Sequence, residues 1–590
     1  MRHFPGTKAG AGLSRYWPAT LAALGAIGLA VAMTGAASAA ARTASGPARV
    51  QSVTRYAVGK RACAAPRRAH TATCYAEIRK VVKKGTKGAR PFKVAAGATR
   101  AGTIGPAGGL TPGDLGTAYG LATTGGHGQT VAIVDAYNDP DINANLQTFD
   151  SHYGLAGCST SNGCLRVVNQ SGGAALPAND TSGWSVEESL DVETVHSVCQ
   201  GCKIVLIEAS SPGNSDLATA ENEAVALGAT EVSNSFGEPE SGSSASFQAA
   251  FNHRGTVITA SAGDDGYDSY DQLSGVDEPN IPAAYNTTVS VGGTSLYLGQ
   301  AATRQSESVW NDNGPRDVLE QDFGQPLGAG GGGCSTLFSA QRWQTALSTW
   351  GSTACGSHRL DSDVSAVGDY LTGFDIYDTD NCGSACAPAP GWFTVGGTSL
   401  SSPLIAAAYA LAGGAHGVAY PALTLYGHQG KAYDVTTGGN GWCDGQGAAQ
   451  CPDPNLLGSG VVDCAYTAGG SVAVGDRACD ALAGFDGPTG VGSPNGLTMF
   501  TRTGPSATIS GPATVTHATS QTWHASTTDP FPGGTLTSYQ WNWGDGSSST
   551  TSTGSAAHTY ATGGVTRTIT LTVTDNYGMT GTATYQVKVN

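Results

Sequence analysis

The sequence predicts an α/β domain, with a largely parallel sheet flanked by helices, followed by a small C-terminal all-β sandwich. In the middle of the chain, short apolar runs typical of buried strands alternate with helical stretches. The strand candidates are Thr130–Ala136, Lys203–Ile207 and Thr256–Ala260, and Asp216–Leu227 is a helix candidate. After Gly504 the pattern changes to Ser- and Thr-rich alternation with regular turn signals, which is typical of a sandwich. The 85 glycines favour an architecture with many tight turns.

The first residues have the pattern of an export signal. Three basic residues, Arg2, Lys8 and Arg15, precede an apolar run from Leu21 to about Met33, and Ala37-Ser38-Ala39 offers small residues for cleavage. The alternative is a membrane anchor, but the run is shorter than the roughly 20 apolar residues that a spanning helix needs. No other stretch of the sequence is long and apolar enough to cross a bilayer. We therefore predict a secreted, extracellular protein with no membrane span in its mature form.

Charge is divided sharply along the chain. Residues 1–110 hold 18 of the 30 Lys and Arg but only one of the 45 acidic residues, Glu77, and the net charge of the whole chain is −15. A basic leader ahead of an acidic body predicts a pro-segment that is held partly by electrostatic attraction, acts as an intramolecular inhibitor and is released as carboxylates protonate in acid. Nucleic-acid binding is the competing interpretation of a basic stretch. Because no aromatic interleaving supports it, we expect no nucleic-acid partner.

The length of 590 residues exceeds that of one compact domain and predicts several units. A loop rich in Gly, Ala and Pro, from about residue 95 to 109, separates the basic leader from the first strongly patterned segment. We divide the chain into a signal peptide at residues 1–39, a basic pro-segment at 40–109, a main domain at 110–503 and a sandwich domain at 504–590.

The 14 cysteines are even in number, and in an exported chain they predict disulfides. Four pairs lie close together in the sequence: Cys63 and Cys74, Cys158 and Cys164, Cys199 and Cys202, and Cys382 and Cys386. The Cys-x-x-Cys at 199–202 has the spacing of half a zinc site or a redox pair as well. No second Cys-x-x-Cys and no histidine cluster accompanies it, which favours a disulfide.

A serine at a glycine-rich entrance to a helix is the candidate nucleophile. Gly396–Pro403 has the sequence GGTSLSSP and leads into the apolar run LIAAAYALAG, which puts Ser399 at the start of a predicted helix. There the tight turn exposes the hydroxyl, and the helix N-terminus offers a dipole and backbone N–H groups to an oxyanion. The same GGTS occurs at Gly292–Ser295, but neither a proline nor a helical run follows it. The context therefore favours Ser399 over Ser295.

A serine hydroxyl needs a base that takes its proton. None of the 12 histidines lies in a His-Gly-Thr type of sequence, and His196, the nearest candidate, has the setting of a packing residue on a helix face. In WSVEESLDVE, Glu187 and Asp191 are four residues apart and would share a helix face. Two carboxyls held close cannot both ionise easily, so one retains a proton while the ionised one can act as general base. An ordinary solvated acidic helix face is the alternative.

The segments around these residues resemble the sedolisin (serine-carboxyl) peptidase family. The run EESLDVETVHSVCQGCKIVLIEA is similar to the acidic helix and strand of sedolisins and kumamolisins, and GTSLSSP matches the family's GTS-x-x-x-P motif. The resemblance covers about residues 110–497. It implies a subtilisin-like fold, with Ser399 as nucleophile, Glu187 as base and Asp191 as the partner of the base. SAGDDG is similar to the family's SxGDxG turn and implies Asp264 in the oxyanion hole, where it donates only while protonated.

Asp135 ends the first predicted strand, in VAIVDAYNDPD. Some members of the family place another acid there, which extends the carboxylate network. A turn-forming or capping role is an equal alternative for this residue. In both cases its side chain would lie at the carboxyl end of a strand, where α/β domains bind ligands.

The resemblance also implies one calcium ion. Asp434-Val435-Thr436 and GFDGPTGVGSP at 484–494 are similar to the two halves of the sedolisin calcium site. Carboxylate oxygens and backbone carbonyls suit such a hard cation. Leu482 stands where the family has Gly, and backbone ligands tolerate that change. The candidate ligands are Asp434, Val435, Leu482, Gly484 and Asp486, and an insertion with Cys443, Cys451, Cys464 and Cys479 separates the two halves.

The C-terminal segment resembles a PKD-type β-sandwich. WNWGDG at Trp541–Gly546 is similar to WDFGDG, with Asn542 and Trp543 in place of Asp and Phe, and HTY and TITLTVTDNYG follow it. By analogy with such modules, this domain would bind an insoluble or surface polymer.

Together these features predict a secreted serine-carboxyl endopeptidase that is made as a pro-enzyme and hydrolyses peptide bonds in proteins at acidic pH. Two alternatives stay open. One is a catalytically inactive secreted adhesion or polymer-binding protein, against which the joint presence of the serine, the two carboxylates and the oxyanion aspartate argues. The other is a histidine-dependent subtilase that uses Asp135, His196 and Ser399.

Overall fold

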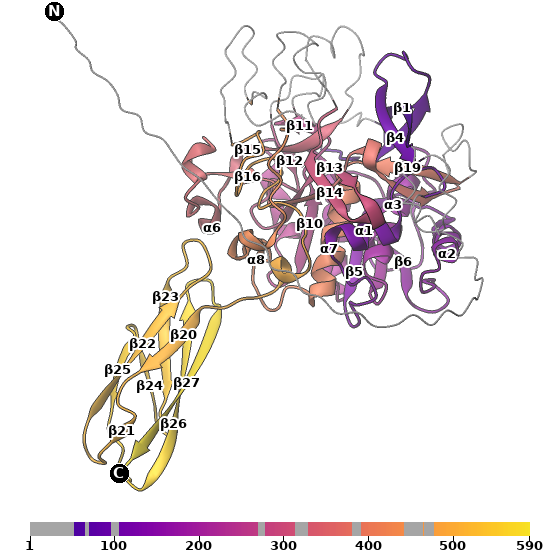
Figure 1. Ribbon diagram of the computed structural model, residues 1–590. Coiled ribbons are helices and arrows are strands. Elements are labelled where there is room, and N and C mark those ends of the chain that lie inside the picture. Colours follow the sequence, from indigo (N-terminus) through magenta and orange to yellow (C-terminus); the bar gives the residue numbers. More distant parts are fainter. Residues whose placement is uncertain are drawn as a thin grey trace, which may run out of the picture. The chain divides into compact units, whose positions relative to one another are not determined.

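The computed structural model describes residues 52–64, 70–95, 105–269, 278–312, 328–379, 391–441, 464 and 477–590 (Figure 1). Its main element is an eight-stranded sheet in the order β14-β13-β10-β8-β5-β7-β6, with β17 paired to β13. Its strands are β5 (Thr130–Ala136), β6 (Leu165–Asn169), β7 (Lys203–Ala209), β8 (Glu231–Asn234), β10 (Val257–Ser261), β13 (Val289–Leu298), β14 (Arg304–Val309) and β17 (Val364–Val367). All neighbours run parallel except β14, which is antiparallel to β13.

Helices pack around this sheet, which confirms the predicted α/β fold. The helices are α1 (Pro112–Tyr119), α2 (Ile142–Tyr153), α3 (Trp184–Val198), α4 (Asn214–Ala226), α6 (Arg342–Thr345), α7 (Thr398–Ala412) and α8 (Ala422–Gly427). The three predicted strands are β5, β7 and β10, and the predicted helix is α4. Strands β5 and β7 are buried along nearly their whole length, as expected of parallel strands with both faces covered.

The two helices that carry the candidate chemistry, α3 and α7, pack against each other. All residues of α3 are buried, although four of them are carboxylic acids. Helix α7 begins after Gly397, whose φ of 96° lies in the region that favours glycine, and it ends at Gly413 in a left-handed cap. The first residues of α7, Thr398 and Ser399, are buried.

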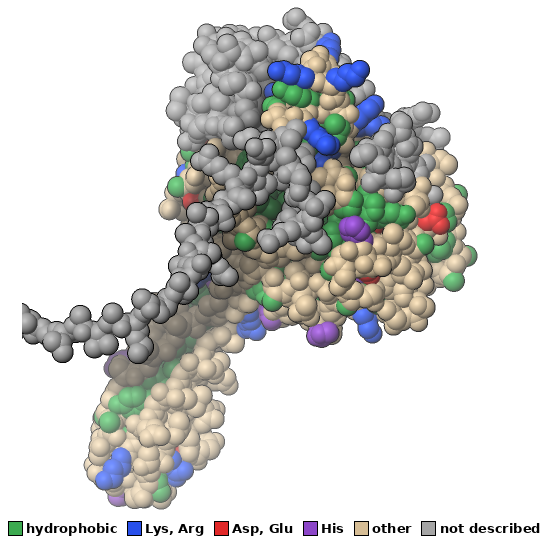
Figure 2. Space-filling view, turned by 45° about the vertical axis from the view of Figure 1, so that its right-hand side comes forward, with side chains coloured by type: hydrophobic (Ala, Val, Ile, Leu, Met, Phe, Trp, Pro, Cys, Tyr) green, Lys and Arg blue, Asp and Glu red, His purple; other side chains and the backbone are tan. Residues whose placement is uncertain are grey.

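Strands from the basic leader add to a second sheet of the main domain. This five-stranded sheet has the order β18-β19-β3-β1-β4, in which β18 and β19 come from the main domain. Its strands are β1 (Ser52–Arg61), β3 (Glu77–Val82), β4 (Arg90–Ala95), β18 (Phe374–Tyr377) and β19 (Trp392–Gly396). Figure 2 shows Lys and Arg side chains gathered at the top of the molecule, where Figure 1 has β1 and β4.

Two small sheets complete the main domain. One has the order β12-β9-β2 and includes a further strand of the leader, and the other has the order β11-β15-β16. Their strands are β2 (Thr73–Cys74), β9 (Phe236–Pro239), β12 (Asn280–Ile281), β11 (Asp265–Tyr267), β15 (Ala329–Ser339) and β16 (His358–Asp361).

The C-terminal segment forms two sheets around a core of its own, which confirms the predicted sandwich, and their strands run antiparallel except for β21, which is parallel to β27. The sheets have the orders β20-β22-β25 and β21-β27-β26-β23-β24. The strands are β20 (Ser506–Ser510), β21 (Thr514–Val515), β22 (Gln521–Thr528), β23 (Leu536–Asn542), β24 (Ser548–Thr551), β25 (Ser555–His558), β26 (Val565–Asp575) and β27 (Thr580–Val589). Trp541 and Trp543 of the WNWGDG motif are buried and stack with ring centroids 5.6 Å apart.

Disulfides join three of the four cysteine pairs that lie close in the sequence. The bonds are Cys63–Cys74, Cys158–Cys164, Cys199–Cys202, Cys334–Cys355 and Cys464–Cys479. The fourth pair, Cys382 and Cys386, and the predicted signal peptide lie outside the described residues. Among the helices of the described residues, none has the length and apolar character that a membrane span requires.

Some carboxyl groups lie in the domain interior away from the candidate site. Glu221 on α4 and Glu231 on β8 are fully buried, and burial raises the pKa of each to about 8. The folded state therefore binds these protons more tightly than the unfolded chain does. Their stabilising contribution is complete below the ordinary pKa of Glu, about 4.3, and is lost as the pH rises through about 8. Both groups make the fold more stable in acid than at neutral pH.

Replacing Glu221 with Gln removes one of these titrations and keeps the size of the side chain. In a Ser399→Ala background, we expect Glu221→Gln to leave the free energy of unfolding unchanged near pH 4. Between roughly pH 5 and 8 the variant should gain about 1.4 kcal/mol per pH unit over its parent. Urea unfolding across this pH range measures the difference. Glu223→Gln, at a partly exposed position of the same helix, is the matched control, and equal pH dependence in parent and Glu221→Gln would contradict the assignment.

Candidate active site

The candidate nucleophile, Ser399, lies in the first turn of α7 and is fully buried. Its hydroxyl donates to the carbonyl oxygen of Ser235 over 3.1 Å and accepts a hydrogen bond from the backbone N–H of Tyr75 over 3.1 Å. Ser235 directly follows β8, so the nucleophile lies beyond the carboxyl end of a central strand. Ligand sites of α/β domains form at this edge of the sheet.

Glu187 and Asp191 lie one turn apart on α3, the helix that packs against the helix of Ser399. The Ser235 hydroxyl donates to Asp191 Oδ1 over 2.8 Å. Burial raises the pKa of Asp191, which this hydrogen bond opposes. Burial also raises the pKa of Glu187, the charges of Asp191 and Asp135 raise it further, and the nearby Ser399 hydroxyl opposes the rise. A carboxylate with a raised pKa is a stronger proton acceptor, as a general base for a serine must be.

Asp135 at the carboxyl end of β5 extends the carboxylate pair. Burial raises the pKa of Asp135, and the charges of Asp191 and Glu208 raise it further. Glu208 is the residue opposite Asp135 on β7, and burial raises its own pKa to about 8. Within the described residues neither carboxyl oxygen of Asp135 has a hydrogen-bond partner, which argues against a capping role. The geometry therefore favours an acid that shares protons with its neighbours over one that closes a turn.

Asp264 lies in the turn after β10 and reaches the residue that precedes the nucleophile. Its Oδ1 accepts hydrogen bonds from the backbone N–H of Thr398 over 2.7 Å and from the Thr398 hydroxyl over 2.8 Å. Burial raises the pKa of Asp264 to about 8, so this carboxyl keeps a proton in acid and at neutral pH. Because Oδ1 already accepts two hydrogen bonds, the proton resides on Oδ2. A protonated Oδ2 beside the start of α7 can donate to an oxyanion.

The alternative residues are engaged elsewhere. His196 lies on α3, but its Nε2 is 2.7 Å from the carbonyl oxygen of Ala156 and 3.3 Å from Asp150 Oδ1. Ser295 lies inside β13, and its hydroxyl donates to Asp369 Oδ2 over 2.7 Å. Neither residue contacts Ser399 through these groups, which argues against a histidine-dependent mechanism and against the second GGTS copy.

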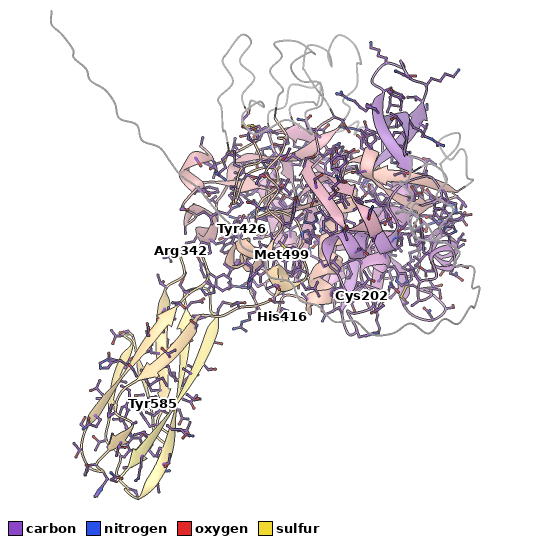
Figure 3. The ribbon with its side chains drawn as sticks, in the orientation of Figure 1. Cys202, Arg342, His416, Tyr426, Met499 and Tyr585 are labelled. Atoms are coloured by element: carbon purple, nitrogen blue, oxygen red, sulfur yellow. A yellow bond between two sulfur atoms is a disulfide. The ribbon has the colours of Figure 1, made fainter. Side chains whose placement is uncertain are left out.

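The Cys-x-x-Cys motif lies at the opposite end of the sheet from the candidate site. Cys199 and Cys202 form a disulfide just before β7 begins, and both are buried. Figure 3 labels Cys202 at the lower edge of the main domain, away from the leader strands at the top. The paired sulfurs and this position argue against a zinc or redox role.

The two candidate halves of the calcium site meet in space. Gly484 N donates to both carboxyl oxygens of Asp434, over 3.2 and 3.1 Å. The buried Asp486 accepts from Leu482 N over 2.9 Å and from Thr489 N over 3.0 Å. Both carboxylates therefore contact one short loop, residues 482–489. Two carboxylates at one loop offer oxygen donors of the kind that a hard cation prefers.

Three residues of the site were missed from the sequence. The Ser235 hydroxyl donates a hydrogen bond to Asp191, and the Thr398 hydroxyl donates one to Asp264. The backbone N–H of Tyr75, a residue of the leader, donates one to Ser399. Thr398 is part of the GTS motif and could have been considered, because its hydroxyl precedes the nucleophile. No sequence signal distinguishes Ser235 or Tyr75, since both make their contacts through the fold of segments that are distant along the chain.

Comparison with known families gives two matches in this chain. The subtilase family matches residues 113–447, and the PKD domain family matches residues 502–589. The first match includes α3, α7 and the turn of Asp264, and the second covers the C-terminal sandwich.

Curated relatives and a solved structure match the main domain. The chain is 26% identical to sedolisin from Pseudomonas sp. (strain 101) over 55% of this chain and 53% of sedolisin. It is 28% identical to kumamolisin from Bacillus sp. (strain MN-32) over 68% of this chain and 65% of kumamolisin. The chain thus spans about half to two thirds of these relatives. The structure of Pseudomonas sedolisin complexed with two molecules of pseudo-iodotyrostatin matches 66% of this chain and 96% of that chain, with 24% identity and a TM-score of 0.50.

Proposed function

The chain belongs to the subtilase family, as a sedolisin-type member with a C-terminal PKD domain, and we propose that it is a secreted serine-carboxyl endopeptidase. The observation that supports this most directly is the contact set of Ser399. Its hydroxyl lies beside Ser235 and Glu187, in a buried site that also holds the carboxyls of Asp191 and Asp264, and the histidine of α3 is engaged elsewhere. The names of the relatives are those of serine-carboxyl peptidases, which suits the same chemistry here.

In the proposed reaction, Ser399 Oγ attacks the carbonyl carbon of a peptide bond while Glu187 accepts its proton. Asp191 shares protons with Glu187 and is itself oriented by the Ser235 hydroxyl. The protonated Asp264 and backbone N–H groups at the start of α7 stabilise the tetrahedral oxyanion. Glu187 then gives its proton to the leaving amine, and a water molecule hydrolyses the acyl-enzyme by the same steps.

Acidic working conditions follow from the protonation states that this reaction needs. One proton must stay on the carboxyl pair, and Asp264 must stay protonated to donate. The pKa of Asp264 is about 8, so the donor is lost as the pH rises through that value. Export and synthesis as a pro-enzyme are supported by the signal-like N-terminus, the disulfides and the contact of leader residue Tyr75 with Ser399.

The carboxylate mechanism predicts a specific pattern of loss among three variants. Ser399→Ala should lower peptide hydrolysis by at least about 10³-fold and Glu187→Gln by at least about 10²-fold, because each removes a group that acts in the transition state. His196→Ala should stay within about threefold of the parent. Hydrolysis of peptides by the purified secreted protein between roughly pH 3 and 8 measures all three. Loss of turnover only in His196→Ala would refute the carboxylate mechanism, and no turnover in a correctly folded parent freed of its leader would favour a polymer-binding protein.

If Asp264 donates to the oxyanion, its substitution by Ala and its substitution by Asn should have different effects on kcat. Asp264→Ala removes the donor and should lower kcat by about 10² to 10³-fold. Asp264→Asn keeps a donor that does not titrate, so it should retain most of kcat near pH 4. It should also lose less activity than the parent between pH 7 and 9, because the parent's donor ionises there. Equal losses in both variants at pH 4 would contradict the donor role of Asp264.

We also propose that one Ca²⁺ binds between the two segments at 434–435 and 482–486. Asp434 and Asp486 would supply carboxylate oxygens, and Val435, Leu482 and Gly484 would supply backbone carbonyls. Such an ion would tie the loop before the end of the main domain to the segment that follows α8. Its contribution is structural, because these residues lie outside the group that contacts Ser399.

Calcium binding predicts a stability change that requires Asp434. At a Ca²⁺ concentration of 100 times Kd, the Ser399→Ala protein should gain about 2.7 kcal/mol over the same protein in EGTA. Thermal unfolding with Ca²⁺, Mg²⁺ or EGTA measures the shift in Tm. Asp434→Ala should unfold at the parent's EGTA temperature and show no shift with Ca²⁺, whereas a parent that shows no Ca²⁺-dependent shift would contradict the proposal.

We assign to the PKD domain the binding of an insoluble or surface polymer, either protein or polysaccharide. The domain has a hydrophobic core of its own, with buried Trp523, Trp541 and Trp543. A module with its own core can carry a binding function that is separate from catalysis, and it would hold the enzyme on a solid substrate.

A further inference from the structure

Residues 71–78 of the leader, which we call the cleft segment, pass through the candidate active site as an extended strand. β2 pairs antiparallel with β9, so that Thr73 is opposite Gly237 and Cys74 is opposite Phe236. On its other edge the cleft segment bridges to Gly213 through Thr71. The segment therefore lies between two extended stretches of the main domain, the arrangement in which proteins bind an added peptide strand.

Backbone contacts continue on the far side of the nucleophile. Tyr75 N donates to the carbonyl oxygen of Ser235 over 3.2 Å as well as to Ser399 Oγ. Two residues later, β3 joins β19, with Glu77 opposite Gly396 and Ile78 opposite Val395. Because both flanks are held in register, the bond at the nucleophile is the one between Tyr75 and Ala76.

The carbonyl oxygen of Tyr75 lies next to Gly397 and Asp264, where the oxyanion would form. A Cβ atom at Gly397 would collide with the Tyr75 carbonyl oxygen and would come within 2.8 Å of Asp264 Oδ2. The Tyr75 carbonyl oxygen and Asp264 Oδ2 therefore lie next to the same glycine, and the proton on Oδ2 is available to the carbonyl oxygen. Gly397 must lack a side chain for this approach, and its φ of 96° also favours glycine.

The Tyr75 side chain fills a pocket next to the nucleophile. It is 2% exposed, and a Cβ atom at Gly237 would lie 2.6 Å from its hydroxyl oxygen. Three residues earlier, Ala72 lines an apolar pocket together with Phe236 and Tyr285. The leader thus presents an aromatic residue directly before the bond and a small apolar residue three positions earlier.

Strand β1 holds the cleft segment on both sides of this bond. Before the bond, Cys74 is joined by a disulfide to Cys63, which lies two residues after the end of β1. After the bond, Ala62 N donates to the Ala76 carbonyl oxygen over 2.8 Å, and β3 pairs with β1. β1 is itself the strand between β3 and β4. Hydrolysis of Tyr75–Ala76 would therefore leave both new ends attached to β1.

Ion pairs fix the end of β1 over the site. The Arg61 guanidinium contacts the carboxylate of Asp265, the residue next to the oxyanion aspartate, and lies 3.7 Å from Glu77. The Asp265 side chain is fully buried and that of Glu77 is 3% exposed, so neither ion pair is well screened by solvent.

We propose that residues 61–78 are a built-in inhibitor that the enzyme cuts at Tyr75–Ala76 and then retains. This rests on the proposed peptidase function and names the bond that the same site cleaves in its own chain. The cleft segment can be cut because it is bound in the register of a substrate. After the cut, the contacts of β1 with both new ends keep these ends in the cleft. Activity toward other proteins then requires that β1 and the Cys63–Cys74 loop leave together.

The chemistry of this step is ordinary hydrolysis. Ser399 Oγ bonds to the carbonyl carbon of Tyr75, Glu187 takes the hydroxyl proton, and the bond to the Ala76 nitrogen breaks as that nitrogen receives the proton. Water then replaces Ser399, which leaves a carboxyl on Tyr75 and an amine on Ala76. Because both ends stay in place, the reverse reaction can expel the same water and remake the bond.

The test starts with the full secreted chain and its mass after acid treatment. Intact-mass analysis under denaturing conditions should find one fragment that ends at Tyr75 and one that begins at Ala76, and Ser399→Ala should stay uncut. Under native conditions the two fragments should elute together from a sizing column. A cut at another bond, or no cut in a protein that hydrolyses added peptides, would overturn the proposal and leave the peptidase function standing. If neither its own chain nor any added peptide is hydrolysed, the peptidase function itself fails.

A paired cysteine variant tests retention separately from cutting. Cys63→Ala/Cys74→Ala should still be cut at Tyr75–Ala76, but the new end at Tyr75 should leave the cleft, so turnover of a peptide substrate should rise at least about tenfold although β1 stays paired with β3 and β4. The matched control is Cys158→Ala/Cys164→Ala, which removes a disulfide with a similarly short loop away from Ser399 and should leave turnover unchanged. Equal turnover in the two variants would show that the disulfide does not hold the inhibitor.

Discussion

The contact between α3 and α7 is the constraint on which the rest of the site depends. It puts two carboxyl groups of one helix beside the serine of the other in a volume where α3 is buried along its whole length. In water, Glu187 would have a pKa of about 4.3 and would be a weak base. Between two packed helices its proton affinity rises, because burial disfavours the charged form more than the nearby Ser399 hydroxyl favours it. In the proposed mechanism, helix packing thereby replaces the histidine that a serine nucleophile usually needs.

The same burial connects stability with catalysis. Asp135, Glu187 and Asp191 are fully buried, and burial raises the pKa of each. Groups of this kind stabilise the folded state below their ordinary pKa, and the contribution is lost as the pH rises through the raised value. The pH range in which the carboxyl pair holds its shared proton is therefore the range in which the fold is most stable. A site built from buried acids favours an acid-stable domain without any separate adaptation of the surface.

The sequence predicted those parts that short-range rules determine. The strands β5, β7 and β10 follow from apolar runs, Ser399 from the glycine-rich entrance to α7, and Glu187 with Asp191 from helical spacing. It did not predict Ser235 or Tyr75, because each contact with Ser399 joins segments 164 or 324 positions apart. Helical spacing alone was equally consistent with an acidic face of α3 that is exposed to solvent, whereas the fold buries this helix completely. Only tertiary packing decides between these two environments.

The charge of the leader alone does not explain how it is removed. Glu77, its one acidic residue, is buried in the cleft, and burial raises its pKa although Arg61 opposes the rise. When the leader dissociates, Glu77 returns to water and to an ordinary pKa. The bound state therefore holds this proton more tightly, and acidification favours the bound leader through Glu77. Protonation of Glu77 therefore does not drive dissociation. In the proposed cut at Tyr75–Ala76, Asp264 keeps its proton both in acid and at neutral pH, because burial raises its pKa to about 8, so hydrolysis can open the leader without any loss of charge attraction.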